Sequence, residues 1–292
     1  HKPWRPRIAQ TGGPSLFLGI TIPMAIYLMF NFSTVIMAIM IAISIAFILG
    51  FIDDIHSLSP KIKVLISALA GLPIVISKAY DPNPFVPIVG QLRITLIYPL
   101  LVLAAYAVLI NASNMFDTHN GLLPSVTLII ISSTIPLQLY LVSKGIAPME
   151  SIVFSLITLG ALIGYLPFNM YPAKVFNGNS GSHFIGAILA SLTIISRLEV
   201  VMIISIMPLV INGFNLIMSI RGLRRKEQIE RPVILMNDYS IKASPNPKSP
   251  ITLVQLLTLR KSLYEPEIVL AISILVYVFC ILASIIFLYA YP

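Results

Sequence analysis

The sequence predicts an all-α membrane protein, a polytopic helix bundle formed by one domain over residues 1–292. Of the 292 residues, 57% are hydrophobic and only 10% are charged, whereas soluble domains carry about 25% charged residues. The apolar residues form continuous runs rather than alternating patterns, which favours helices over membrane strands. A helix needs roughly 20 apolar residues to cross the hydrocarbon layer. About nine runs reach or approach this length: 14–30, 34–52, 64–77, 96–110, 122–142, 152–168, 183–196, 200–220 and 268–289.

The charges divide unevenly when successive connections are assigned to alternate sides of the membrane. One side receives 15 of the 19 Lys and Arg residues and the other only four. By the positive-inside rule the first side is cytoplasmic. It receives residues 1–13, 53–63, 111–121, 169–182 and 221–267, whereas the C-terminus lies outside. We therefore expect a multi-pass plasma-membrane protein with its polar chemistry on the cytoplasmic face.

The net charge of +8 would suggest nucleic acid as the partner of a soluble protein. In a membrane protein it is better explained by cytoplasmic loops and anionic lipids or substrates, so we expect no nucleic-acid partner. The single cysteine, Cys280, excludes an intramolecular disulfide. Because residue 1 is His, we expect the natural chain to begin earlier.

The sequence GFIDDIHSLSPKIK, residues 50–63, ends an apolar run in two adjacent carboxylates, Asp53 and Asp54. Acids at the end of a span are costly unless they lie at the water boundary or line a polar cavity. Carboxylates suit a magnesium ion, and Lys61 and Lys63 are placed to bind phosphates. The alternative is a membrane helix that ends in solvated charges.

The sequence NASNMFDTHNGL, residues 111–122, follows another apolar run and places polar residues three apart. If the helix continues, Asn111, Asn114, Asp117 and Asn120 lie near one face. Their amide and carboxylate groups could hold a metal, a diphosphate or a sugar. The alternative is a fraying helix end with polar caps, but four such groups exceed what a cap needs.

The remaining polar segments carry weaker signals. The turn before His183, residues 175–182, opens an apolar run, and backbone N–H groups at a helix start can bind phosphate. A plain loop is the alternative, and His183 itself is expected at the membrane boundary. In the long loop 221–267, Arg221 and Arg225 could bind a diphosphate or simply anchor the preceding span. Residues 78–95 are expected to form a hairpin or lid.

Four stretches, HKPWRPRIAQTGG, GFIDDIHSLSPKIK, NASNMFDTHNGL and VFNGNSGSHFIG, occur in the order found in one enzyme family. They resemble the polyprenyl-phosphate N-acetylhexosamine-1-phosphate transferases, of the glycosyltransferase family 4 type. The similarity covers nearly the whole chain. GFIDD, Lys63 and the NGL at Asn120 most resemble the archaeal and eukaryotic dolichyl-phosphate GlcNAc-1-phosphate transferases. Members have ten membrane helices, so nine runs imply that the first helix is absent here.

The resemblance implies a reaction and its partners. GlcNAc-1-phosphate would pass from UDP-GlcNAc to a polyprenyl (dolichyl) phosphate, giving lipid-diphospho-GlcNAc and UMP. This is the first step of lipid-linked oligosaccharide assembly for N-glycosylation. The cofactor would be Mg²⁺, with Mn²⁺ as an alternative, and the partners a lipid bilayer and, as one option, a second copy of the chain.

The resemblance also assigns roles to individual residues. The acidic residues Asp53, Asp54 and Asp117 belong to the catalytic motifs, and Asn114, Asn179 and Asp117 match the metal site. The substrate-binding positions are Lys63, Asn111, Asn120 and Gln10, to which we add Arg221 and Arg225 from their charge and spacing. A phosphate monoester is largely dianionic at pH 7, with a second pKa of about 6. We therefore expect Asp53 and Asp54 to organise metal, water or lysine rather than to act as strong bases.

Two departures from the family pattern bear on the site. Asn179 replaces an aspartate that is usual at the metal, and Thr118 replaces a glycine that is usual near the nucleoside. Three alternatives follow. The chain could transfer another UDP-sugar-1-phosphate for cell-wall or surface polysaccharide, could be a membrane transporter, or could be a transferase-like protein inactivated by Asn179.

Overall fold

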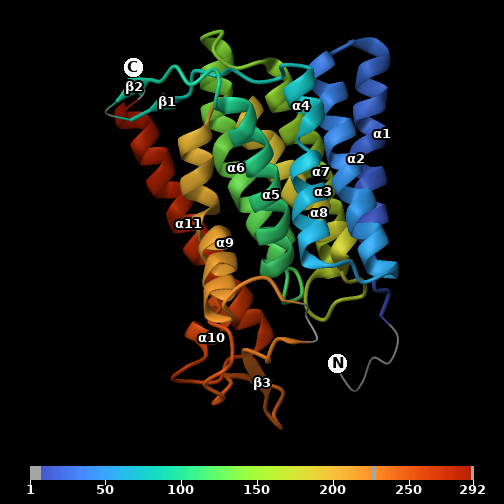
Figure 1. Ribbon diagram of the computed structural model, residues 1–292, viewed down its shortest axis with the longest axis vertical. Coiled ribbons are helices and arrows are strands. Elements are labelled where there is room, and N and C mark those ends of the chain that lie inside the picture. The colour runs from blue at the N-terminus through green and yellow to red at the C-terminus, as the bar shows by residue number, and fades with distance from the viewer. Residues whose placement is uncertain (1–7, 88, 225–227, 291–292) are drawn as a thin grey trace.

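The computed structural model describes residues 8–87, 89–224 and 228–290, and it is an all-α bundle with two small hairpins (Figure 1). The helices are α1 (Gly13–Phe30), α2 (Thr34–Ile55), α3 (Pro60–Leu69), α4 (Leu72–Ile76), α5 (Tyr98–Phe116), α6 (Leu122–Ser143), α7 (Met149–Asn169), α8 (Gly178–Ile195), α9 (Glu199–Ser219), α10 (Leu253–Leu257) and α11 (Glu265–Ala290). The strands are β1 (Phe85–Val86), β2 (Gly90–Gln91), β3 (Val233–Leu235) and β4 (Ile241–Ala243).

All nine apolar runs of the sequence form helices. Within the described residues, seven helices are long and apolar enough to cross a membrane: α1, α2, α5, α6, α7, α9 and α11. The run at 64–77 is divided between α3 and α4, which are separated at Ala70 and Gly71. The run at 183–196 is the apolar part of α8, whose first turn is polar. The polytopic bundle is therefore confirmed, and two of its members differ from simple apolar spans.

The ends of the helices follow from local sequence. Ser33 caps α2 by accepting a hydrogen bond from the Ile36 N–H, and Ser59 caps α3 by accepting one from Ile62. Pro60 occupies the first turn of α3, where the missing N–H costs nothing. Because α3 begins at this proline, Lys63 lies in its first turn, close to the end of α2.

Helix α8 occupies the centre of the bundle. Every residue from Ser180 to Ile195 is buried, and the helix packs most extensively against α2 and α5. The contact with α2 is very close at Gly50, where an added Cβ would lie 2.3 Å from the carbonyl oxygen of Asn179. A side chain at Gly50 would therefore push the start of α8 away from the two aspartates of α2.

Successive connections between the long helices lie at alternate ends of the bundle, as the sequence predicted. In Figure 1 the start of α1, α10 and β3 lie at the lower end, and the end of α11 lies at the upper end with β1 and β2. The β1–β2 pair, with Phe85 opposite Gln91, is the hairpin expected within residues 78–95. The long loop 221–267 contains the antiparallel β3–β4 hairpin and α10. We call the lower end the site end.

Candidate functional site

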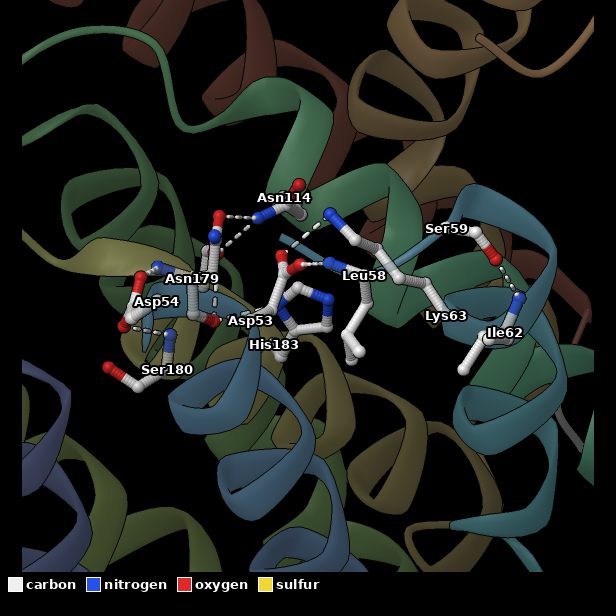
Figure 2. Close-up of polar contacts among 11 residues, drawn as sticks. Asp53, Asp54, Leu58, Ser59, Ile62, Lys63, Asn114, Asn179, Ser180 and His183 are labelled. Atoms are coloured by element: carbon white, nitrogen blue, oxygen red, sulfur yellow. Dashed lines mark hydrogen bonds and ion pairs between the residues drawn. The ribbon is translucent and has the colours of Figure 1, made fainter. Parts of the chain in front are cut away.

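The polar centre of the site end is an ion pair between α2 and α3 (Figure 2). The Lys63 Nζ atom lies 2.6 Å from Asp53 Oδ2, and the side chain of Asp53 is only 1% exposed. Asp53 Oδ1 also accepts a hydrogen bond of 2.9 Å from the N–H of Leu58. The carboxylate is thus held at both oxygens, and the cation stays partly accessible, with 22% of its side chain exposed.

Asp54 has a different role from its neighbour. Its two oxygens accept hydrogen bonds from the backbone N–H groups of Asn179, at 2.7 Å, and Ser180, at 3.0 Å. These groups belong to the first turn of α8, where a carboxylate is favoured by unsatisfied donors and by the helix dipole. Gly178 permits this contact, because it has φ +68° and an added Cβ would lie 2.8 Å from Asp54 Oδ2. Asp54 therefore anchors α8 to α2.

A group of amides connects α5 to α8. Asn114 donates from Nδ2 to Asn179 Oδ1 and to Ser182 Oγ, both at 2.9 Å. His183 lies in the same group and is fully buried. Its Nδ1 donates to the carbonyl oxygen of Asn179 at 2.7 Å, and Nε2 has no protein partner. His183 lies near the start of α8 and is enclosed within the bundle, where α8 packs against α2 and α5.

The predicted polar stripe on α5 is only partly formed, because the helix ends at Phe116. Asp117 is its C-cap, and its Oδ1 accepts a 2.8 Å hydrogen bond from Asn177 Nδ2. Asn111 turns back along the helix to bond the carbonyl of Ala107 at 2.8 Å. Asn120 lies in the following turn, buried, with its backbone N–H bonded elsewhere. The regular three-residue spacing does not place all four side chains on one helical face.

The N-terminal segment runs beside the turn that precedes α8. Ala9 and Val175 form a parallel bridge, and the Phe176 N–H donates to the Ala9 carbonyl at 2.9 Å. Gln10 is exposed next to this turn, and its carbonyl oxygen lies close to Gly178. This places Gln10 beside the site.

Of the two arginines expected to bind a diphosphate, only Arg221 lies among the described residues, and no described contact joins it to the site. Arg221 is exposed at the end of α9, with a left-handed backbone of φ 57°. Arg225 lies outside the described residues.

The donor set at the site end fits a hard divalent cation. Asn114 uses its nitrogen for its bonds to Asn179 and Ser182, so its amide oxygen remains available, and the buried Asn177 Oδ1 has no protein partner. Carboxylate and amide oxygens are preferred ligands of Mg²⁺. No group of three or more His, Cys, Asp or Glu side chains forms a metal cluster in the described part of the chain. Such a cation would therefore rely largely on neutral amides.

Several contacts of the site have no strong signal in the sequence. Asn177 and Ser182 are separated from their partners by 60 and 68 residues. Both fall within the turn before His183, residues 175–182, but nothing in the local sequence indicates which of its side chains face α5. The partner of the Gly121 N–H is Asn169 Oδ1, at 3.0 Å, a residue that the sequence gives no reason to choose.

Comparison with known proteins gives a consistent result. A sequence model of glycosyl transferase family 4 matches residues 36–197, more than half of the chain. A protein of Sulfolobus acidocaldarius is 28% identical over 61% of this chain and 53% of its own length, and carries the provisional name UDP-N-acetylglucosamine–dolichyl-phosphate N-acetylglucosaminephosphotransferase. A provisionally named glycosyltransferase of Methanocaldococcus jannaschii is 32% identical over 65% of this chain and 58% of its own length.

A bacterial relative extends the comparison. A Bacillus subtilis protein, provisionally named undecaprenyl-phosphate N-acetylglucosaminyl 1-phosphate transferase, is 29% identical over 76% of this chain and 62% of its own length. The chain thus spans between about half and two thirds of the length of these relatives. The matched residues 36–197 include both aspartates of α2, Lys63, and the facing ends of α5 and α8.

Proposed function

Because this chain belongs to glycosyl transferase family 4, we propose that it transfers GlcNAc-1-phosphate from UDP-GlcNAc to a polyprenyl phosphate of the dolichyl type. The products would be lipid-diphospho-GlcNAc and UMP, and the reaction would begin lipid-linked oligosaccharide assembly for N-glycosylation. The names of the archaeal and bacterial relatives support this choice of substrates. The observation that carries it is the pairing of buried Asp53 with the partly accessible Lys63, beside the amides of Asn114 and Asn179.

Lys63 is the residue placed to receive the diphosphate. Within the described residues, the ion pair of its ammonium is with Asp53. An ammonium has three N–H donors, so some remain for the oxygens of a phosphate. Asp53 is fixed in turn by the Leu58 N–H, and its contact with the Lys63 ammonium orients the lysine before substrate arrives. The lipid phosphate is already largely dianionic at pH 7, so its attack on the β-phosphorus of UDP-GlcNAc needs no strong base.

The amide group between α5 and α8 is the second part of the proposed site. Asn114, Asn179 and Asp117 would hold the Mg²⁺, which would neutralise the charge that develops on the diphosphate. Asn179 is oriented by Asn114 through its side chain and by Asp54 through its backbone. This double attachment fixes the residue without a carboxylate of its own, which is how a neutral side chain could still serve at this position.

We place the site on the cytoplasmic face of the plasma membrane, on the strength of the charge asymmetry between the two sets of loops. Membrane-impermeant thiol labelling tests this orientation in a Cys280→Ala background. Ser57→Cys should react only from the cytoplasmic side and Ser143→Cys only from outside. Labelling of both from one side would contradict the assignment.

The activity is tested with purified protein in lipid, radiolabelled UDP-GlcNAc and dolichyl phosphate. We expect magnesium-dependent UMP release together with a labelled lipid. Transfer from a different UDP-sugar alone would assign the chain to another substrate within the family. Activity that appears only in Asn179→Asp would identify a degenerate transferase. If neither protein turns over any lipid phosphate, the proposal is wrong.

A further inference from the structure

The loop between α5 and α6 carries Asp117 and is attached to three other helices. Asp117 bonds Asn177 at the start of α8, and the Gly121 N–H bonds Asn169 at the end of α7. The third attachment comes from α11, where Glu265 Oε1 accepts a 2.7 Å hydrogen bond from the Asn120 N–H. Residues 117–121 are therefore held from three sides although they form no regular structure of their own.

The Glu265 contact is favourable for two physical reasons. A carboxylate that accepts from an N–H makes a charge-assisted bond, which is stronger than one between neutral groups. The N–H belongs to the residue just before Gly121, the N-cap of α6, so the carboxylate also lies near the positive end of that helix dipole. Asn120 and Glu265 are 145 residues apart in the sequence, so this bond fixes the position of α11 relative to the site loop.

Glu265 differs from the other acid in the first turn of α11. Glu267 makes a local contact, in which its Oε2 accepts from the Tyr264 N–H at 2.7 Å. In a capping box, the acidic side chain at the third helical position accepts from the N–H of the N-cap residue in this way. Glu265 makes the long-range bond instead. The segment before α11 is also fixed, because Leu263 and Ile241 of β4 exchange backbone hydrogen bonds at 2.8 and 3.0 Å. Glu265 is thus held where the long loop returns to the bundle.

From these contacts we propose that Glu265 is a positioning residue, whose carboxylate clamps the α5–α6 loop so that Asp117 stays directed at the start of α8. It acts through Asn120 and Asp117, not by contact with substrate. This role rests on the proposed transferase function for its kinetic consequence, but the clamp itself is a property of the fold. It also gives Asn120 a role through its backbone, in addition to the predicted substrate contact of its side chain.

Hydrogen exchange tests the clamp directly, with the two glutamates as a matched pair. In Glu265→Ala the Asn120 amide should exchange about tenfold faster or more, the range expected for loss of a bond to a charged group. Glu267→Ala removes the same charge two residues away, in the same first turn of α11, and should leave the exchange rate of the Asn120 amide unchanged. Glu265→Gln keeps a carbonyl acceptor and should restore much of the protection. Unchanged exchange at Asn120 in Glu265→Ala would overturn the clamp.

The positioning role is tested by nucleotide binding and kinetics. Glu265→Ala should weaken UDP-GlcNAc binding and raise its KM about tenfold, with a smaller change in kcat, and Glu265→Gln should recover most of this loss. Faster exchange at Asn120 with unaltered binding and KM would show a clamp without influence on the site, and would overturn the role. If the wild type transfers no sugar phosphate, the exchange experiment still decides the clamp, so failure of the activity and failure of this inference are distinguishable.

Discussion

The two ends of the bundle use polar residues differently. At the end opposite the site, charged groups are matched by close partners: Arg197 with Asp81, Glu199 with the Tyr98 hydroxyl at 2.6 Å, and Glu150 with Ser33 at 2.8 Å. At the site end, Asp54 and the Asp53–Lys63 pair are equally well satisfied. Beside them, however, buried acceptors and donors remain without protein partners.

The unpartnered atoms distinguish a binding site from a cluster of helix caps. His183 Nε2, Asn177 Oδ1 and Ser180 Oγ are buried at the site end without hydrogen-bond partners, whereas Glu199 Oε2 is such an atom at the opposite end. A buried polar group without a partner costs about 1–3 kcal/mol. A ligand, or water bound with it, that forms the missing hydrogen bonds would explain why several such atoms lie close together. These unpartnered atoms lie at the end of the bundle that carries the proposed site.

The largest effect should come from removing the cation of the site. Lys63→Ala should lower turnover by about 100-fold or more, the loss typical for one preorganised group that stabilises developing charge. Lys61→Ala, two residues away and exposed, is the matched control and should retain most of the activity. The labelled-lipid assay measures turnover in both variants. Equal and mild losses of turnover would mean that both lysines only contribute positive charge at the membrane interface.

Removing the cap of α8 should lower stability and activity together. Asp54→Ala leaves the N–H groups of Asn179 and Ser180 without their carboxylate, which should cost about 1–2 kcal/mol of folding free energy. A thermal melt in detergent measures the loss. Asp54→Asn keeps one acceptor and should melt at an intermediate temperature. An unchanged melting temperature in Asp54→Ala would show that this contact does not secure the helix.

Restoring a carboxylate in the amide group should change the metal dependence more than the rate. Asn179→Asp replaces an ion–dipole contact by an ion–ion contact, so the magnesium concentration for half-maximal activity should fall. The maximal rate need not rise, because tighter binding in the ground state alone does not accelerate the chemistry. Asn179→Ala should lose most activity at any magnesium concentration. Wild-type metal dependence in the alanine variant would remove Asn179 from the metal site.

The smallest effect is expected at the opposite end of the bundle. Asp81→Ala breaks the ion pair with Arg197. The side chain of Asp81 is 29% exposed and that of Arg197 is 26% exposed. Such half-exposed pairs contribute about 1 kcal/mol or less, so the melting temperature should fall slightly, and KM and metal dependence should stay at wild-type values. A marked change in either kinetic quantity would mean that the two ends are coupled through the bundle.

The sequence by itself determined the class of fold and the end of the bundle at which its polar motifs gather. Continuous apolar runs can satisfy their backbone only as helices in a bilayer, and the alternation of connections gathered the acidic and amide motifs at one end. The stretch GFIDDIHSLSPKIK contains both members of the Asp53–Lys63 pair, which are only ten positions apart and come together because α3 begins at Pro60.

Only the tertiary structure decided what each polar side chain does. Adjacent Asp53 and Asp54 point to different helices, so one holds a lysine and the other caps α8. The stripe expected from Asn111 to Asn120 is broken because α5 ends at Phe116, and Glu265 reaches the site loop from 145 residues away. Spacing along the chain reports local geometry, whereas these contacts depend on how closely separate helices approach, which local sequence does not encode.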